Sequence, residues 1–326
     1  MIKQFGTFSK FFSQNSIADI VSALPKPSTP MADFLFPEAK RQQKHSPFVA
    51  IEDITEETGA VPLVLRGGRS IPIDPTGKKR TLLEVDPVSV SRFASAKDIN
   101  DLMAMGDAES IKGYVSEQVE KLRNRVSETI EVLCRQAMTG KISYPYQSSG
   151  GTCDIELGTP VAATKADISA GTLAALQTWL EELTNTHIAK TGTSSNLVFL
   201  LAGNVYSKVV SILTSIQNAP VIWKPEGMVL FGKYDIRSIG LTYTLPGSST
   251  VEKVIKDGHA RVLSLDYTGK LIFASLDDMD ANLAPLPFYA KAIEKKDPDG
   301  VKIVGSSKPL PALALTKQTS QEVKIA

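Results

Sequence analysis

The strongest constraint on this chain is a long stretch in which apolar residues recur at steps of three and four positions. Such steps place apolar side chains on one face of an α-helix, so the pattern predicts one amphipathic helix over residues 108–139. Asp107 can cap its start, and Gly140 can end it. At ~1.5 Å per residue the helix would be about 46 Å long, whereas a usual helix has ~11–12 residues. The apolar positions are Ile111, Val115, Val119, Leu122, Val126, Ile130, Leu133 and Ala137.

The heptad-like spacing would also suit a coiled coil, but the rest of the chain has a mixed, globular composition. Of its 326 residues, 42% are hydrophobic and 22% are charged, which excludes wholesale disorder and suggests one large domain or two small ones. The 36 Lys and Arg residues nearly balance the 35 Asp and Glu residues, which argues against a dedicated polybasic nucleic-acid binder. The longest apolar run, residues 197–202, has the length of a strand and is far short of the ~20 residues of a membrane helix.

Two segments before the long helix lack the material for a core of their own. Residues 1–45 contain Pro25, Pro27, Pro30 and Pro37, and such closely spaced prolines predict an extended arm. Residues 46–95 hold strand-like runs separated by Gly-Gly and Asp-Pro-x-Gly turn signals, so we expect a long β-hairpin. Because little of this hairpin is apolar, it should need a partner surface.

After the long helix the sequence changes to short elements of an α+β protein. We expect a hairpin over residues 142–157, a helix capped by Ser169, a buried strand at 197–202, and a further helix that runs to Ile216. Short β-rich runs follow up to residue 273, and no internal repeat is visible.

The sequence carries no recognisable catalytic motif. Phosphate-binding loops, dinucleotide-binding fingerprints, nucleophile elbows and zinc-protease motifs are all absent. His45, His187 and His259 are far apart, which favours structural roles, and two cysteines suit a reducing compartment rather than a disulfide framework. We therefore predict no enzyme activity, no cofactor, and no catalytic, cofactor-binding or metal-ligating residues.

Two cysteines and one acidic cluster are the remaining residues that could carry chemistry. Cys134 lies beside the apolar stripe and is expected to be a buried small hydrophobe, while Cys153 has no neighbouring base. The carboxylates at 277–280 could hold a hard cation, although a solvated acidic turn is the favoured interpretation. An arm and a hairpin that cannot bury themselves are instead typical of a self-assembling structural protein.

The order of these elements and several local motifs resemble the major capsid protein E family of lambda-like tailed bacteriophages. The long helix runs into Met138-Thr139-Gly140-Lys141-Ile142 and a following hairpin, as in that family. The arm with Phe34-Leu35-Phe36-Pro37 and the turn Arg66-Gly67-Gly68-Arg69 are also similar. The most specific part of the resemblance lies near the C-terminal end of the sequence. It consists of Phe288-Tyr289-Ala290-Lys291, Asp297-Pro298 and Ser306-Ser307-Lys308-Pro309-Leu310-Pro311.

The resemblance implies the Hong Kong ninety-seven-type (Johnson) phage capsid fold, an α+β fold. It implies an N-terminal arm at 1–45, an extended E-loop hairpin at 46–95, and a P-domain at 96–185 with a spine helix at 108–139. An A-domain would follow at 186–270, and residues 271–326 would return to the P-domain and form the C-terminal tail. The family's arm and loop make Arg66, Gly67, Gly68, Arg69, Phe34 and Phe36 candidate inter-subunit contact residues.

The resemblance also implies a function. The chain would be a major capsid protein whose copies form pentamers and hexamers of an icosahedral head shell around double-stranded DNA, without sequence-specific DNA binding or a membrane. Scaffold, portal and decoration proteins are implied partners, and the protein would belong to the virion after assembly in the host bacterial cytoplasm. The alternatives are an encapsulin-like compartment with the same fold and an α/β enzyme whose site no motif marks.

Overall fold

A computed structural model describes residues 9–50, 82–105, 108–147, 150–215, 220–238 and 242–325. Its central beam is the helix α5 (Ala108–Thr139), so the predicted long helix is confirmed with the same bounds. Every predicted apolar position on it is at most 8% exposed, which agrees with a stripe that faces a core. Gly140 ends the helix with a φ of +103°, a conformation that favours glycine. The expected cap Asp107 lies outside the described residues.

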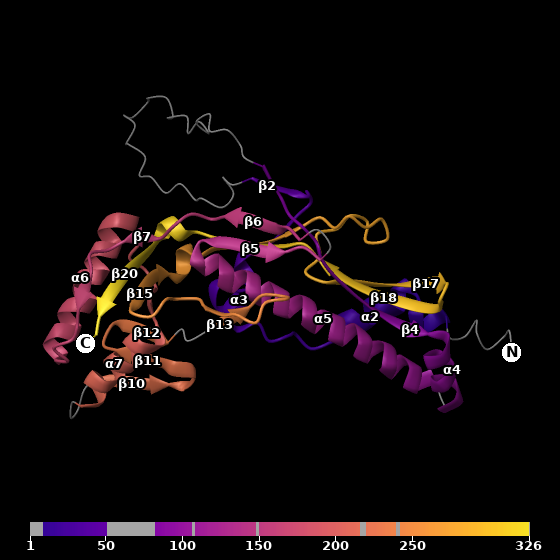
Figure 1. Cartoon of the computed structure of the whole chain (residues 1–326), viewed down its shortest axis with the longest axis horizontal. Helices are drawn as coiled ribbons and strands as arrows, with labels where there is room; N and C mark the ends of the chain where they lie inside the picture. Colours follow the sequence, from indigo (N-terminus) through magenta and orange to yellow (C-terminus); the bar gives the residue numbers. More distant parts are fainter. Residues whose placement is uncertain are drawn as a thin grey trace, which may run out of the picture.

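A three-stranded antiparallel sheet covers the N-terminal half of α5 (Figure 1). Its strands run in the order β17 (Tyr289–Lys296), β18 (Asp299–Ser307) and β4 (Val88–Ser95). The helix α2 (Gln14–Ala23) packs against α5 and β17, and α4 (Ala96–Met105) packs against β4 and β18. Ile17 and Ile20 thereby join Val115 and Val119 in one buried cluster.

An eight-stranded mixed sheet lies at the other end of the molecule (Figure 1). The buried strand β9 (Leu197–Leu201), predicted from its apolar run, lies at its centre between a parallel β12 and an antiparallel β15. The helices α6 (Leu173–Thr191) and α7 (Gly203–Thr214) pack against this sheet. The other strands are β10 (Val221–Lys224), β11 (Met228–Phe231), β12 (Tyr234–Ser238), β15 (His259–Ser264), β20 (Gln318–Lys324), β7 (Val161–Ala162) and β8 (Ala166–Asp167).

Smaller sheets connect the two ends. The strands β5 (Lys141–Pro145) and β6 (Thr152–Glu156) form the hairpin expected after the long helix. The strand β2 (Phe48–Ala50) pairs with β3 (Leu82–Glu84), so the two ends of the expected E-loop hairpin lie side by side. The remaining strands are β1 (Arg41–Lys44), β16 (Gly269–Ala274) and β19 (Pro309–Leu313) in one sheet, and β13 (Thr242–Thr244) with β14 (Val251–Lys253). Short 3-10 helices cover Ser9–Phe12, Glu38–Lys40, Pro225–Gly227, Leu265–Tyr267 and Leu315–Lys317.

The described part of the N-terminal segment forms short helices up to Lys40 and then the strand β1, rather than one extended arm. Besides α2, it contains α3 (Pro30–Leu35), in which Pro30 occupies the first helical position, where a missing N–H costs nothing. The prolines therefore limit the length of the helices without preventing them. A second difference is that Thr172, and not Ser169, caps α6, because the Thr172 side chain accepts a hydrogen bond from the Ala175 N–H.

Packing crosses two of the domain boundaries that the resemblance implies. The helix α6 runs through the boundary at 185 and 186 without interruption. The strand β20 pairs with β15, so the last described residues lie in the eight-stranded sheet and not beside the spine helix. Within the described part of the chain, no helix is long and apolar enough to cross a membrane.

Candidate assembly site

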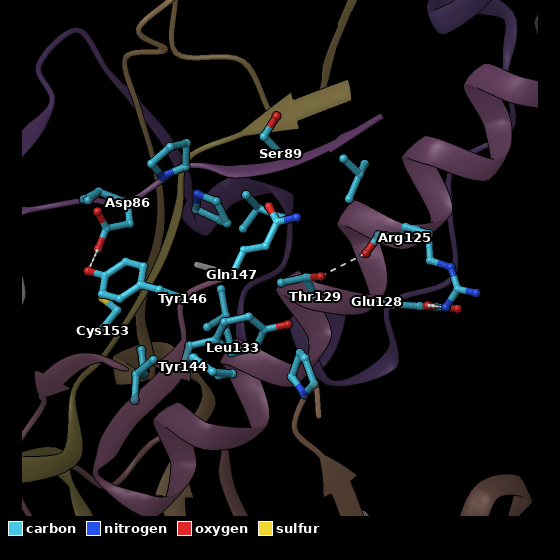
Figure 2. A pocket seen from close by; sticks show the side chains of 18 of the residues that line it. Asp86, Ser89, Arg125, Glu128, Thr129, Leu133, Tyr144, Tyr146, Gln147 and Cys153 are labelled. Atoms are coloured by element: carbon cyan, nitrogen blue, oxygen red, sulfur yellow. Dashed lines mark hydrogen bonds and ion pairs between the residues drawn. The ribbon is translucent and has the colours of Figure 1, made fainter. Parts of the chain in front are cut away.

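A groove with a volume of about 1530 Å³ runs beside the long helix. One wall is formed by residues 85–92 in and before β4, and the facing wall by residues 121–133 of α5. The β5–β6 hairpin closes one end, where Tyr144, Tyr146 and Cys153 are visible in Figure 2. Among the described residues β4 pairs with β18 alone. The other edge of β4 therefore has no partner strand there, and residues of β4 line the groove. A strand edge beside an apolar groove can accept an extended segment of another chain.

The polar groups of the groove are unsuited to catalysis. Tyr146 donates a hydrogen bond of 2.6 Å to an Asp86 carboxylate oxygen (Figure 2), and this bond raises the pKa of Tyr146. Burial, together with Asp86, raises the pKa of the Cys153 thiol to about 11. The thiol is therefore protonated near neutral pH, whereas the thiolate is the nucleophile. Arg125 and Glu128 on α5 form an exposed ion pair with an N–O distance of 3.0 Å.

His187 is a structural residue, as the sequence suggested. Its side chain is fully buried, with Nδ1 2.9 Å from the Thr319 hydroxyl and Nε2 2.9 Å from the Thr193 hydroxyl. Burial lowers the pKa of His187 to about 4, so the imidazole is neutral and connects α6 to the strand β20. Across the described part of the chain, no three His, Cys, Asp or Glu side chains are grouped as metal ligands.

The acidic turn at 277–280 is paired with lysines rather than merely solvated. The Lys291 ammonium lies 2.8 Å from an Asp278 oxygen and 2.7 Å from an Asp280 oxygen. Lys308, whose side chain is almost fully buried, reaches an Asp277 oxygen at 2.5 Å. Two lysine ammonium groups therefore neutralise part of the charge of three aspartates, and the turn stays acidic with Asp277 and Asp280 largely exposed.

The candidate contact residues have different surroundings. Arg66, Gly67, Gly68 and Arg69 lie outside the described residues. The Phe34 ring is partly buried, and the Arg237 guanidinium stacks on it at 4.7 Å from the ring centroid. Phe36 is fully buried in the main core of its own subunit, so the expectation that its side chain reaches a neighbouring subunit is corrected. Phe36 fills the space beside α5 because α3 folds back onto that helix.

The contact that holds α3 on the beam was not predicted from the sequence. The buried Glu131 carboxylate accepts hydrogen bonds from the backbone N–H groups of Met31, at 2.9 Å, and Ala32, at 3.0 Å. Arg135 also binds Glu131, at 3.0 Å, and donates to the Thr242 carbonyl at 2.8 Å. The available signal was the spacing of Glu131 and Arg135 on one helix face, which suggests a surface ion pair and does not reveal the third partner.

A helical beam with a small sheet at one end, a mixed sheet at the other and a projecting strand pair defines a subunit of the Hong Kong ninety-seven-type capsid fold. A solved structure assigned as a prophage capsid protein of E. coli CFT073 shares this fold with a TM-score of 0.61 at 13% identity, over 95% of this chain and 98% of the other. The model of the phage major capsid protein E family matches residues 13–319, and the chain belongs to this family. It is thus a non-enzymatic shell protein of a phage capsid and a component of the virion.

Two other solved structures are similar to this chain. A phage-related protein from Bordetella bronchiseptica RB50 matches with a TM-score of 0.49 at 10% identity, over 94% of this chain and 95% of that one. The capsid asymmetric unit of cyanophage A-1(L) matches with a TM-score of 0.46 at 14% identity, over 94% and 95%. A search of curated proteins found no significant relative.

Proposed function

We propose that copies of this chain form pentamers and hexamers of a closed icosahedral head shell that encloses the double-stranded DNA of a tailed phage. Membership of the family supports a shell, and the groove beside α5 is the observation that carries the proposed mode of assembly. A scaffold, a portal and decoration proteins are the further proposed partners, and the host bacterial cytoplasm is the proposed place of assembly.

In the proposed assembly, the hairpin of one subunit binds in the groove of the neighbouring subunit. The proposed hairpin would begin after β2 and end before β3, where Phe48 is 42% exposed and Leu82 is 61% exposed. The neighbouring subunit offers the edge of β4 and an apolar wall that includes Leu133 and Tyr144. Adding a strand to β4 would give directional backbone hydrogen bonds as well as buried apolar area.

The charge balance supports enclosure of DNA without tight binding. A net charge of +1 on 326 residues would cause little repulsion when many copies pack side by side. It also offers few surplus cations for phosphate neutralisation, which dominates non-specific DNA affinity.

The first experiment examines the purified full-length protein by negative-stain microscopy and gradient sedimentation. Capsomers or closed shells are the expected result, and the ratio of absorbance at 260 and 280 nm tells a DNA-filled shell from a protein-filled compartment. A monodisperse monomer at high concentration, whatever the salt, would contradict the proposal.

The second experiment tests the groove with two tryptophan variants of the same helix. Asn124 lines the groove, whereas Glu120 is exposed on α5 but does not line it. Asn124→Trp should block shell formation while the subunit remains folded, and Glu120→Trp should assemble as the wild type does. Deletion of residues 60–80 should likewise abolish shells and spare a folded core, and unimpaired shells from it would refute the role of the hairpin.

A further inference from the structure

The loop at residues 275–288, between β16 and β17, presents an apolar tip to solvent. Met279 is 81% exposed and Leu283 is 49% exposed, and neither belongs to a buried cluster. Asn282 and Leu283 adopt φ values of +52° and +55°, a left-handed conformation that asparagine tolerates but that is unfavourable for leucine. Backbone hydrogen bonds close the turn, with the Leu283 N–H donating to the Asp278 carbonyl at 3.1 Å. The tip is thus held in one shape: Ala281 anchors it in a small buried cluster, while Met279 and Leu283 point away from that cluster and stay exposed.

Lysine side chains fasten this loop and leave an acidic rim around the tip. Lys291 binds both Asp278 and Asp280, and the buried Lys308 binds Asp277. A buried ammonium is costly unless paired, so Lys308 fixes the position of Asp277. The side chains of Asp277 and Asp280 nevertheless remain 70% and 64% exposed. We call residues 277–283 the acidic knob.

The outer face of the β17–β18–β4 sheet has the opposite character. Ile293 lies opposite Lys302, which lies opposite Phe93, so the three side chains form one row on one face. Phe93 is 42% exposed and Ile293 is 37% exposed, whereas Ile303 on the inner face is buried. Lys295, two residues along β17, belongs to the outer face as well.

Phe93 is held in place on this face. A Cβ atom added at Gly300 would come within 2.6 Å of the Phe93 ring, so the ring lies directly over that glycine. The ring is therefore fixed across the neighbouring strand with part of its surface open to solvent. We call Phe93, Ile293, Lys295 and Lys302 the basic platform.

We infer that the acidic knob of one copy of this chain binds the basic platform of a second copy. Met279 and Leu283 would pack on Phe93 and Ile293, with the exposed aspartates of the knob facing Lys302 and Lys295. Methionine and aromatic residues are enriched at the cores of protein interfaces, and a surrounding rim of opposite charge fixes the register. The inference rests on the proposed function, because a shell of identical chains presents knobs and platforms in equal number.

Two single charge variants and their double variant test whether opposite charges hold this contact together. Met279 makes no ion pair, so Met279→Lys adds a cation to the knob without removing a fastening contact. Met279→Lys and Lys302→Glu should each lower the assembled fraction about tenfold or more, because like charges are brought together in the first and a Glu faces the acidic rim in the second. The double variant should recover at least half of the lost assembly. Val251→Lys, at a 60% exposed position on β14, is the matched control and should assemble normally.

A disulfide test then identifies the partner. In a Cys153→Ser background, chains with Met279→Cys and chains with Ile293→Cys are mixed, assembled and mildly oxidised. Cross-linked dimers are expected from the mixture and not from either chain alone, and the other thiol, Cys134, is buried.

The outcomes separate this inference from the proposed function. If the wild type assembles but the single charge variants assemble equally well, or the double variant is no better than either, the knob contact is refuted and the shell remains. The absence of cross-links from the assembled mixture would also refute it, as would binding of the knob by a different protein within the shell. If the wild type itself never assembles, the proposed function fails first. Circular dichroism of each variant shows whether a loss of assembly comes from a loss of folding.

Discussion

Replacing Glu131 with glutamine should weaken the attachment of α3 to the long helix α5 and lower the stability of the subunit measurably. Glu131 is 6% exposed, and its carboxylate is bound by two backbone N–H groups of α3 and by Arg135. A hydrogen bond to a charged group contributes ~1.5–3 kcal/mol, whereas a neutral one contributes ~0.5–1.5 kcal/mol. Glu131→Gln keeps the shape but loses the charge.

The expected change follows from the three partners of the Glu131 carboxylate, which are the Met31 N–H, the Ala32 N–H and the Arg135 guanidinium. At about 1 kcal/mol lost for each, Glu131→Gln should lower the free energy of unfolding by about 3 kcal/mol. Arg135 keeps its bond to the Thr242 carbonyl, which limits the further penalty of an unpaired guanidinium. The assay is equilibrium urea unfolding of unassembled subunits, followed by circular dichroism at concentrations too low for assembly.

The matched control is Glu128→Gln on the same helix. Glu128 pairs with Arg125, but both side chains are largely exposed, at 66% and 75%, so the loss should stay below about 0.5 kcal/mol. If Glu131→Gln costs no more than Glu128→Gln, the carboxylate does not hold α3 on α5 and the reasoning is refuted.

Two further predictions concern stability. Burial lowers the pKa of His187 to about 4, below the ~6.5 of an unfolded chain, so its stabilising effect is complete above pH 6.5 and is lost as the pH falls towards 4. The loss should approach about 3 kcal/mol, and His187→Gln should flatten the pH profile of the unfolding free energy; an equally steep profile would contradict this. Gly140→Ala should destabilise the chain by about 2 kcal/mol or more, since φ is +103° and the new Cβ would lie 2.5 Å from the Gly158 carbonyl oxygen. Gly113→Ala, inside α5 with no atom within 4 Å, should instead stabilise it by ~0.5–1 kcal/mol, and equal effects of the two changes would refute the steric argument.

The local sequence pattern was sufficient to predict those helices and strands in which apolar residues recur with the period of the element. The helix α5, the hairpin β5–β6 and the strand β9 were predicted because each carries an apolar period or run that only one kind of element can bury.

Contacts between distant segments were not readable in this way. Gln318, Thr319 and Gln321 are polar, yet they are buried in β20 because this strand pairs with β15 inside the large sheet. Phe36 looked available to a neighbour until α3 was seen to fold back onto α5. The acidic turn is largely exposed, as expected, but its ion pairs were not predicted because the lysine partners lie 11 to 31 residues further along the chain.

The amino-acid order therefore specifies which segments are helix or strand and that some of them cannot form a core alone, since both properties depend on neighbours a few residues away. It does not specify which exposed side chains meet on one face. The groove beside α5 combines residues more than a hundred positions apart, and the basic platform joins three strands through their register. Such surfaces form only when distant strands pair in one register. The register decides to which face of the sheet each side chain points, and the local sequence alone does not fix it.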